Sequence, residues 1–210
     1  TLLDTTVIWD KFGIRASKTA DIMNDWSTTM GMSTSEIQKT GRAAMDFAVK
    51  AGLPVEQVMT QMAEATTHFH DSLNSDYAVR QSLIFTARAK AMGASVQGLM
   101  GVLKGFEDIE TGQKAGAELN ATLTALGGSF DAMKAMSMDY PERMEYMATA
   151  IQQVAPRIKA ASPIVQRKYM QALAKALPGG SVAMVRKFMT FKPGEMIDAE
   201  RDLTAGVMGA

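Results

Sequence analysis

The sequence of 210 residues lacks cysteine and is poor in aromatic side chains. Without cysteine it can form no disulfide, thiolate zinc site or cysteine nucleophile. It has 8 Phe, 4 Tyr and 2 Trp, but 18 Met. Met is a flexible side chain that fills irregular cores and adapts to more than one packing partner. Two uses therefore stay open, a Met-filled helical core and an adaptable assembly interface.

Neither sign of charge is in excess, because 22 basic residues balance 22 acidic ones. This balance predicts no specific nucleic-acid binding and no attraction to acidic membranes, although it does not exclude a local patch. No run reaches the roughly 18 apolar residues of a membrane span, and no secretory signal is visible. The sequence starts at Thr1 without an initiating Met, which leaves a fragment and a processed product open.

No segment alternates apolar and polar residues long enough to predict a β-strand. Helix formers dominate instead, and Gly or Pro interrupts them at short intervals. No heptad pattern and no longer repeat is sustained. The sequence therefore predicts an all-α fold, a bundle of about ten short helices with no significant β-sheet.

Capping residues and helix breakers predict where the helices begin and end. Ser33 and Glu36 make an S-x-x-E capping box, and Pro54 suits a first helical position. Further starts are predicted at Asn74 or Ser75, Ser95, Thr111, Asp139 with Glu142, and Ser162–Pro163. The matching ends are predicted at Gly52, Gly93, Gly127–Gly128 and Pro178–Gly180.

Apolar residues at helical spacing predict the buried faces. After Thr111 this face is Leu119, Leu123 and Leu126. After Asp139 it is Tyr140, Met144, Met147, Ala148 and Ile151. After Ser162 it is Val165, Tyr169, Ala172, Leu173, Ala176 and Leu177.

A soft boundary near Asp71–Ser75 predicts three parts of the chain. Residues 1–73 form an N-terminal helical arm and residues 74–190 a compact helical domain. Residues 191–210 are weakly patterned, and we expect them to be weakly structured.

We predict that the chain is not an enzyme and has no catalytic, cofactor-binding or metal-binding residues. Motifs of zinc proteases, nucleotide-binding proteins and hydrolases are absent from the sequence. The two histidines, His68 and His70, are two positions apart and would point to different faces of a helix. We therefore interpret His68-Phe69-His70-Asp71 as a surface helix end.

Two acidic clusters are candidates for glycosidase carboxylates. We expect Glu107, Asp108 and Glu110 at a helix C-terminus in a polar turn, and Glu200 lies near Asp202. Neither cluster lies in an apolar sequence that would raise the pKa of one carboxyl group, so a catalytic pair is not predicted.

Small residues predict close contacts between helices. Gly93, Gly98, Gly101 and Gly105 form one series, and charged residues interrupt its apolar run, which favours a soluble bundle over a membrane pair. A second slim face is predicted at Ala115, Gly116, Ala117 and Ala121. Four methionines are candidates for either contact or core, namely Met136, Met138, Met144 and Met147.

Five pieces follow one another in order. They are Ala89–Val96 (A-K-A-M-G-A-S-V), Lys104–Asp108 (K-G-F-E-D), Ala115–Gly128 (A-G-A-E-L-N-A-T-L-T-A-L-G-G), Asp139–Glu145 (D-Y-P-E-R-M-E) and Val165–Gly179. This succession resembles the helical region of phage tail tape measure proteins. Ala51–Glu56 (A-G-L-P-V-E) resembles a helix junction there, so the resemblance covers about residues 40–190. The family pattern has a Thr before its F-E, which is replaced around Gly105–Phe106, and the ring before Glu-Arg is Tyr140. These departures leave the subfamily open.

The resemblance implies a virion structural protein of the tail lumen and tip, found in the host cytoplasm during assembly. Such a protein sets tail length, is anchored at the tail tube and baseplate hub, and leaves the tube during genome ejection, which we expect to require partial unfolding. The implied partners are tail-tube and hub proteins, other copies in a trimer or similar, a transient assembly chaperone, and the host envelope on ejection. The alternatives are a stand-alone helical interaction module, adaptor or chaperone-like, and a cell-wall hydrolase or membrane-active tail component.

Overall fold

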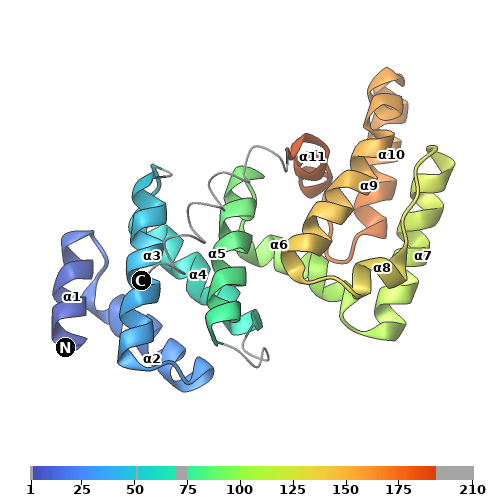
Figure 1. Cartoon of the computed structure of the whole chain (residues 1–210). Coiled ribbons are helices and arrows are strands. Elements are labelled where there is room, and N and C mark those ends of the chain that lie inside the picture. Colours follow the sequence, from blue (N-terminus) through green and yellow to red (C-terminus); the bar gives the residue numbers. More distant parts are fainter. Residues whose placement is uncertain (1, 51, 70–74, 193–210) are drawn as a thin grey trace. The chain divides into compact units, whose positions relative to one another are not determined.

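The computed structural model describes residues 2–50, 52–69 and 75–192 (Figure 1). In these ranges the chain forms eleven α-helices and one 3-10 helix and no strand, which confirms the all-α prediction. The elements are α1 (Leu2–Lys11), α2 (Ala16–Met30), α3 (Thr34–Lys50), α4 (Val55–Phe69), α5 (Ser75–Ala91), α6 (Val96–Leu103), η1 (Lys104–Phe106), α7 (Ile109–Ala125), α8 (Ala132–Met136), α9 (Tyr140–Ala160), α10 (Pro163–Ala176) and α11 (Val182–Thr190).

The chain divides into two compact units, and each is described by itself. Unit 1 contains the residues up to Ala87, and unit 2 begins at Arg88, so the division falls within α5. The sequence-based boundary was placed near Asp71–Ser75, of which residues 71–74 lie outside the described part. No described helix is both long and apolar enough to cross a membrane.

The core of unit 1 is built around two tryptophans. Trp9 of α1 and Trp26 of α2 meet edge to face with ring centroids 6.2 Å apart, and both side chains are buried. Gly41 of α3 lies against Trp9, since a Cβ atom built on this glycine would be 2.3 Å from Cζ2 of the indole. Met59 and Met62 of α4 are buried in the same core. Unit 1 therefore uses Met as core filler and a glycine to admit a large ring.

Helix α9 runs through unit 2 and packs against α6, α7, α8, α10 and α11. Figure 1 shows α10 running beside α9, with the short α8 near α7. The predicted inward face of α9 is confirmed, because all its members are buried, namely Tyr140, Met144, Met147, Ala148 and Ile151. The predicted stripe on α7 is confirmed as well, namely Leu119, Leu123 and Leu126.

Several predicted helix starts and ends are confirmed by their caps. Ser33 and Glu36 exchange hydrogen bonds, from Ser33 N to Glu36 Oε2 over 2.6 Å and from Glu36 N to Ser33 Oγ over 3.3 Å. Ser95 accepts from the backbone N–H of the third residue after it, and so does Asp139. The predicted ends at glycine have left-handed backbone, with φ of +63° at Gly52, +66° at Gly93 and +82° at Gly127.

The prediction of a helix start at Thr111 is wrong, because α7 begins at Ile109 and Asp108 is its N-cap. Asp108 Oδ1 accepts from the backbone N–H of Thr111 over 2.9 Å and from its hydroxyl over 3.2 Å. The prediction that the acidic cluster lies at a helix C-terminus is wrong for Asp108 and Glu110. They lie at the N-terminus of α7, where the helix dipole favours negative charge, while Glu107 follows η1.

Two further details differ from the sequence-based prediction. Helix α8 is not predicted from the sequence, because at five residues it is too short for a periodic pattern. On α10 the predicted inward residue Ala172 is exposed, and Met170 is buried instead. Leu173, Ala176 and Leu177 are buried as predicted, whereas Val165 and Tyr169 are half-buried, so the buried face is shifted around the helix.

Candidate functional site

Arg143 forms the most connected polar centre of unit 2. It is 5% exposed and is the one buried charged side chain among the described residues. Its Nε donates to the carbonyl of Ala135 over 2.8 Å, and Nη1 donates to that of Leu103 over 2.9 Å. Its Nη2 donates to Met138 O over 2.9 Å and to Met136 O over 3.4 Å. One guanidinium group therefore ties the end of α6 and the α8 region to α9.

Arg143 donates to backbone carbonyls rather than to carboxylates. Burial lowers the pKa of its guanidinium, while the charges of Glu107 and Asp139 act in the opposite direction. Its group also lies over the ring of Tyr140, with Cζ 5.4 Å from the centroid. Because the ordinary pKa of arginine lies far above neutral pH, the guanidinium group stays charged there. The arrangement joins helices and offers no base or nucleophile.

Two glycines on α7 allow α8 to approach closely. A Cβ atom built on Gly116 would lie 2.2 Å from Cβ of Ala132, and one on Gly112 would lie 2.6 Å from Sδ of Met136. Any larger residue at either position would have to displace its neighbour. The slim face predicted around Gly116 thus makes a helix contact.

Only some glycines of the series Gly93, Gly98, Gly101 and Gly105 make close contacts. A Cβ atom on Gly105 would lie 2.2 Å from Cβ of Pro178, so η1 and the turn after α10 touch here. Gly98 lies near Ser95 Oγ and Met184 Cε, but Gly101 has nothing within 4 Å of such an atom. Close packing is therefore the role of Gly105, and Gly101 has open space.

An aromatic cluster fixes the connection between α7 and α9. Phe130 lies edge to face with Phe106 at 5.6 Å and beside Tyr146 at 5.3 Å, between ring centroids. Its backbone N–H donates to Asn120 Oδ1 over 2.9 Å, and that of Asp131 donates to Tyr146 Oη over 3.0 Å. Asn120, the Asn of the L-N pair in the third sequence piece, thus supports a turn.

The structure describes only some of the site candidates that the sequence offers. His68 lies within α4, whereas His70, Asp71, Glu200 and Asp202 lie outside the described residues. In the part of the chain that the structure describes, no group of three or more His, Asp or Glu side chains is placed to hold a metal ion.

The four candidate methionines separate into two pairs. Met144 and Met147 are fully buried and belong to the core. Met136 and Met138 are half-buried, and their carbonyls accept from Arg143. The methionine that the structure exposes most clearly is Met133, at 60%.

An open hollow of about 410 Å³ lies between α2 and α4 in unit 1. It is lined by Lys18, Asp21, Ile22, Asn24, Asp25, Thr60, Ala63 and Glu64. Asp25 Oδ1 accepts from Thr29 Oγ1 over 3.1 Å on the same helix. The lining mixes both signs of charge with the apolar Ile22 and Ala63, so this hollow has no defined chemistry.

Charge in unit 2 is strongly segregated along the chain. Residues 146–192 contain eight basic residues and no Asp or Glu. The basic residues are Arg157, Lys159, Arg167, Lys168, Lys175, Arg186, Lys187 and Lys192. The C-terminal half of α9 and the whole of α10 and α11 therefore carry positive charge only.

Two glutamines hold these helices in place. Gln152 Nε2 of α9 donates to the carbonyls of Phe188 over 2.9 Å and Phe191 over 2.5 Å, at the end of α11. Gln166 Nε2 of α10 donates to Ala161 O over 2.8 Å. The basic side chains thus project from helices with fixed positions on α9.

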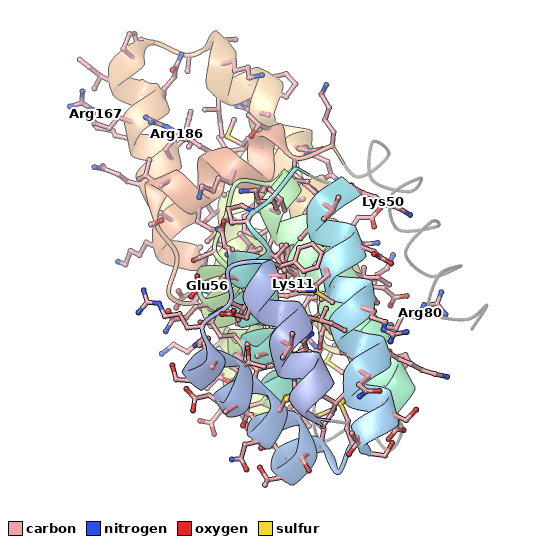
Figure 2. All side chains as sticks on the ribbon, turned by 90° about the vertical axis from the view of Figure 1, so that its left-hand side faces the viewer. Lys11, Lys50, Glu56, Arg80, Arg167 and Arg186 are labelled. Atoms are coloured by element: carbon pink, nitrogen blue, oxygen red, sulfur yellow. The ribbon has the colours of Figure 1, made fainter. Side chains whose placement is uncertain are left out.

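Arg167, Lys168 and Lys175 are exposed on α10, and Arg186 is exposed on α11. We call these four residues the basic face. Lys168 and Lys175 lie on one side of α10 because they are seven positions, close to two turns, apart. Figure 2 shows Arg167 and Arg186 projecting to the same side of two helices that pack together.

This face is not predicted from the total charge, because basic and acidic residues balance over the whole chain. Counting charged residues along the chain finds it, since a stretch of 47 residues without a carboxylate contrasts with the balanced total charge.

Comparison with protein-family models, curated proteins and solved structures finds no match for this chain.

Proposed function

We propose that this chain is part of a phage tail tape measure protein, a virion structural protein that acts through packing and assembly. The supporting observation is the coincidence between the five pieces of the resemblance and the joints of unit 2. Several residues that make these contacts lie inside the pieces, namely Gly105, Gly116, Asn120 and Arg143.

The second and third pieces supply the glycine contacts. Gly105 of K-G-F-E-D meets Pro178, which belongs to the fifth piece. Gly116 of the A-G-A-E-L-N piece meets Ala132 of α8. Asp108, the last residue of K-G-F-E-D, caps α7.

The fourth piece supplies the polar joint. Asp139 caps α9 through the backbone N–H of Glu142 over 2.9 Å, and Arg143 of P-E-R binds the carbonyls around α6 and α8. A sequence pattern that marks caps and contacts describes one folded unit, which fits a globular segment of a larger structural protein.

In this proposal the protein sets the length of the tail, is anchored at the tail tube and baseplate hub, and is released during genome ejection. Tail-tube and hub proteins and further copies of the chain are its partners. Release requires partial unfolding of unit 2. Hydrogen exchange tests this step, and near-global protection throughout residues 92–147 would count against it.

A stand-alone helical interaction module is the second candidate, because unit 1 and unit 2 each form a compact body. Sedimentation of the purified 210-residue chain separates the two. Concentration-dependent association, a trimer above all, supports the assembly protein. A monodisperse monomer with one sharp melting transition supports the module.

We propose no catalytic role, and a zymogram on bacterial cell walls tests this part. Clearing by the purified chain would revive the hydrolase alternative. A liposome-leakage assay tests the membrane-active alternative in the same way.

A further inference from the structure

We propose that the basic face of unit 2, formed by Arg167, Lys168, Lys175 and Arg186, binds the phosphodiester backbone of a nucleic acid without regard to sequence. The inference rests on charge and geometry in unit 2 and does not depend on the proposed function.

Helix stability explains some of the positive charge in residues 146–192. Cations in the last turn of a helix interact favourably with its dipole, and Arg157, Lys159 and Lys175 occupy such positions. Lys187, also in a last turn, donates a hydrogen bond to the carbonyl of Gly93. These residues have a structural reason to be basic.

Arg167, Lys168 and Arg186 have no such reason. Arg167 and Lys168 lie in the first half of α10, and Arg186 precedes the last turn of α11. The structure gives these three side chains no ion pair within the described residues. Neither helix contains a carboxylate with which an intrahelical pair could form. Their like charges repel one another, and a bound anion would relieve that repulsion.

The uniform positive charge of the basic face indicates which kind of anion it binds. A protein partner normally presents both signs, and its interface matches them with both signs in return. A phosphodiester backbone presents negative charge alone, at regular spacing, and a carboxylate beside it would be repelled. A face on helices that lack carboxylates altogether therefore fits a nucleic acid better than an acidic protein. Uncharged Gln171 and exposed Ile164 complete the outer side of α10.

The salt dependence of binding reports phosphate contacts directly, because each contact releases counterions from the nucleic acid. The observed binding constant falls with salt along a slope of about −0.9 per phosphate contacted on duplex DNA. We therefore measure fluorescence anisotropy of a labelled mixed-sequence duplex of about 30 base pairs with the 210-residue chain, between roughly 50 and 200 mM salt. We expect binding that weakens linearly on a log–log plot and is equal for a second duplex of unrelated sequence.

A triple variant, Arg167→Gln with Lys168→Gln and Arg186→Gln, tests the face itself. We expect at least a roughly tenfold loss of affinity at low salt and a slope flatter by about 2.7, which is 0.9 for each contact removed. The variant Arg167→Lys with Arg186→Lys keeps the charge and is expected to bind like the unmodified chain. Circular dichroism checks that each variant is folded.

The matched control removes the same net charge from unit 1, through Lys11→Gln, Lys39→Gln and Lys50→Gln. These lysines are exposed, so their replacement leaves the basic face intact. We expect this control to retain most of the affinity and the slope.

Three outcomes would overturn the proposal. They are no binding of the duplex at low salt, an equal loss of affinity in the unit 1 control, and equally tight binding of polyglutamate of matched charge. The last outcome would assign the face to an acidic polypeptide instead.

Discussion

Nη1 of Arg143 donates to the carbonyl oxygen of Leu103 over 2.9 Å, between residues that are 40 positions apart in the chain. The contact joins α9 to the end of α6. The same guanidinium group binds Ala135, so it also joins α8. A charged side chain on one helix that donates to two others holds the three together. Its removal leaves buried carbonyls without a donor.

Replacement of Arg143 by Met is expected to lower the free energy of unfolding of unit 2 by about 3–5 kcal/mol, since the buried acceptors lose a charged partner. Arg143→Lys should recover only part of this loss, because an ammonium group lacks the planar fork. Urea unfolding followed by circular dichroism measures both. Arg157→Met, at an exposed position in the last turn of the same helix, is the control and should lower stability by under about 1 kcal/mol, since only an interaction with the helix dipole is lost.

Gly105→Ala and Gly116→Ala are each expected to destabilise unit 2 by about 1–3 kcal/mol, because the added methyl group overlaps Pro178 or Ala132. Gly101→Ala is the matched control on α6, where a Cβ atom meets nothing within 4 Å. That change should raise stability by up to about 1 kcal/mol through helix propensity. Equal effects at all three positions would show that the close contacts do not govern packing.

Gly41→Ala is expected to disturb unit 1, because the new Cβ atom would lie 2.3 Å from Cζ2 of Trp9. Both tryptophans of the chain, Trp9 and Trp26, are buried in this unit, so tryptophan fluorescence follows its unfolding. We expect a lower fluorescence midpoint in urea and a changed native emission. Arg42→Ala, exposed on the same helix, should alter neither.

Asp108 links the stability of α7 to pH. Hydrogen bonds from Thr111, the backbone N–H first, hold the pKa of its carboxyl below the ordinary 3.8. The folded-state pKa is lowered, so the stabilisation is present above pH 3.8 and is lost as pH falls through the folded-state pKa. Asp108→Asn should keep a cap and lose this acid dependence, while Asp108→Ala should lose both. Thermal melts between neutral and acid pH compare the three proteins, and unchanged acid sensitivity in Asp108→Asn would contradict the assignment.

Caps were predictable from the sequence because they are local. Ser95, Asp139 and Ser33 with Glu36 need only a neighbour three residues away, and the structure gives each that neighbour. The prediction of the start of α7 was wrong because two residues that can cap a helix, Asp108 and Thr111, lie within one turn of each other. The earlier one accepts from the later one, and the chain leaves η1 just before it.

The joints could not be predicted because they depend on distant partners. Nothing near Arg143 in the sequence indicates that its acceptors come from residues as far away as Leu103. The inward face of α10 likewise depends on which helices cover it, so Ala172 and Met170 exchanged roles. The basic face could have been predicted from the sequence, by counting basic and acidic residues along the chain.

Tail length in phage particles tests the proposed tape measure function most directly. In-frame deletions are made in the encoding gene outside residues 1–210, and tails are measured by electron microscopy. A helical ruler rises about 1.5 Å per residue, so removing about 60 residues should shorten the tail by roughly 90 Å. Tails that keep their length after such deletions, or a gene that encodes little more than these 210 residues, would contradict the proposal.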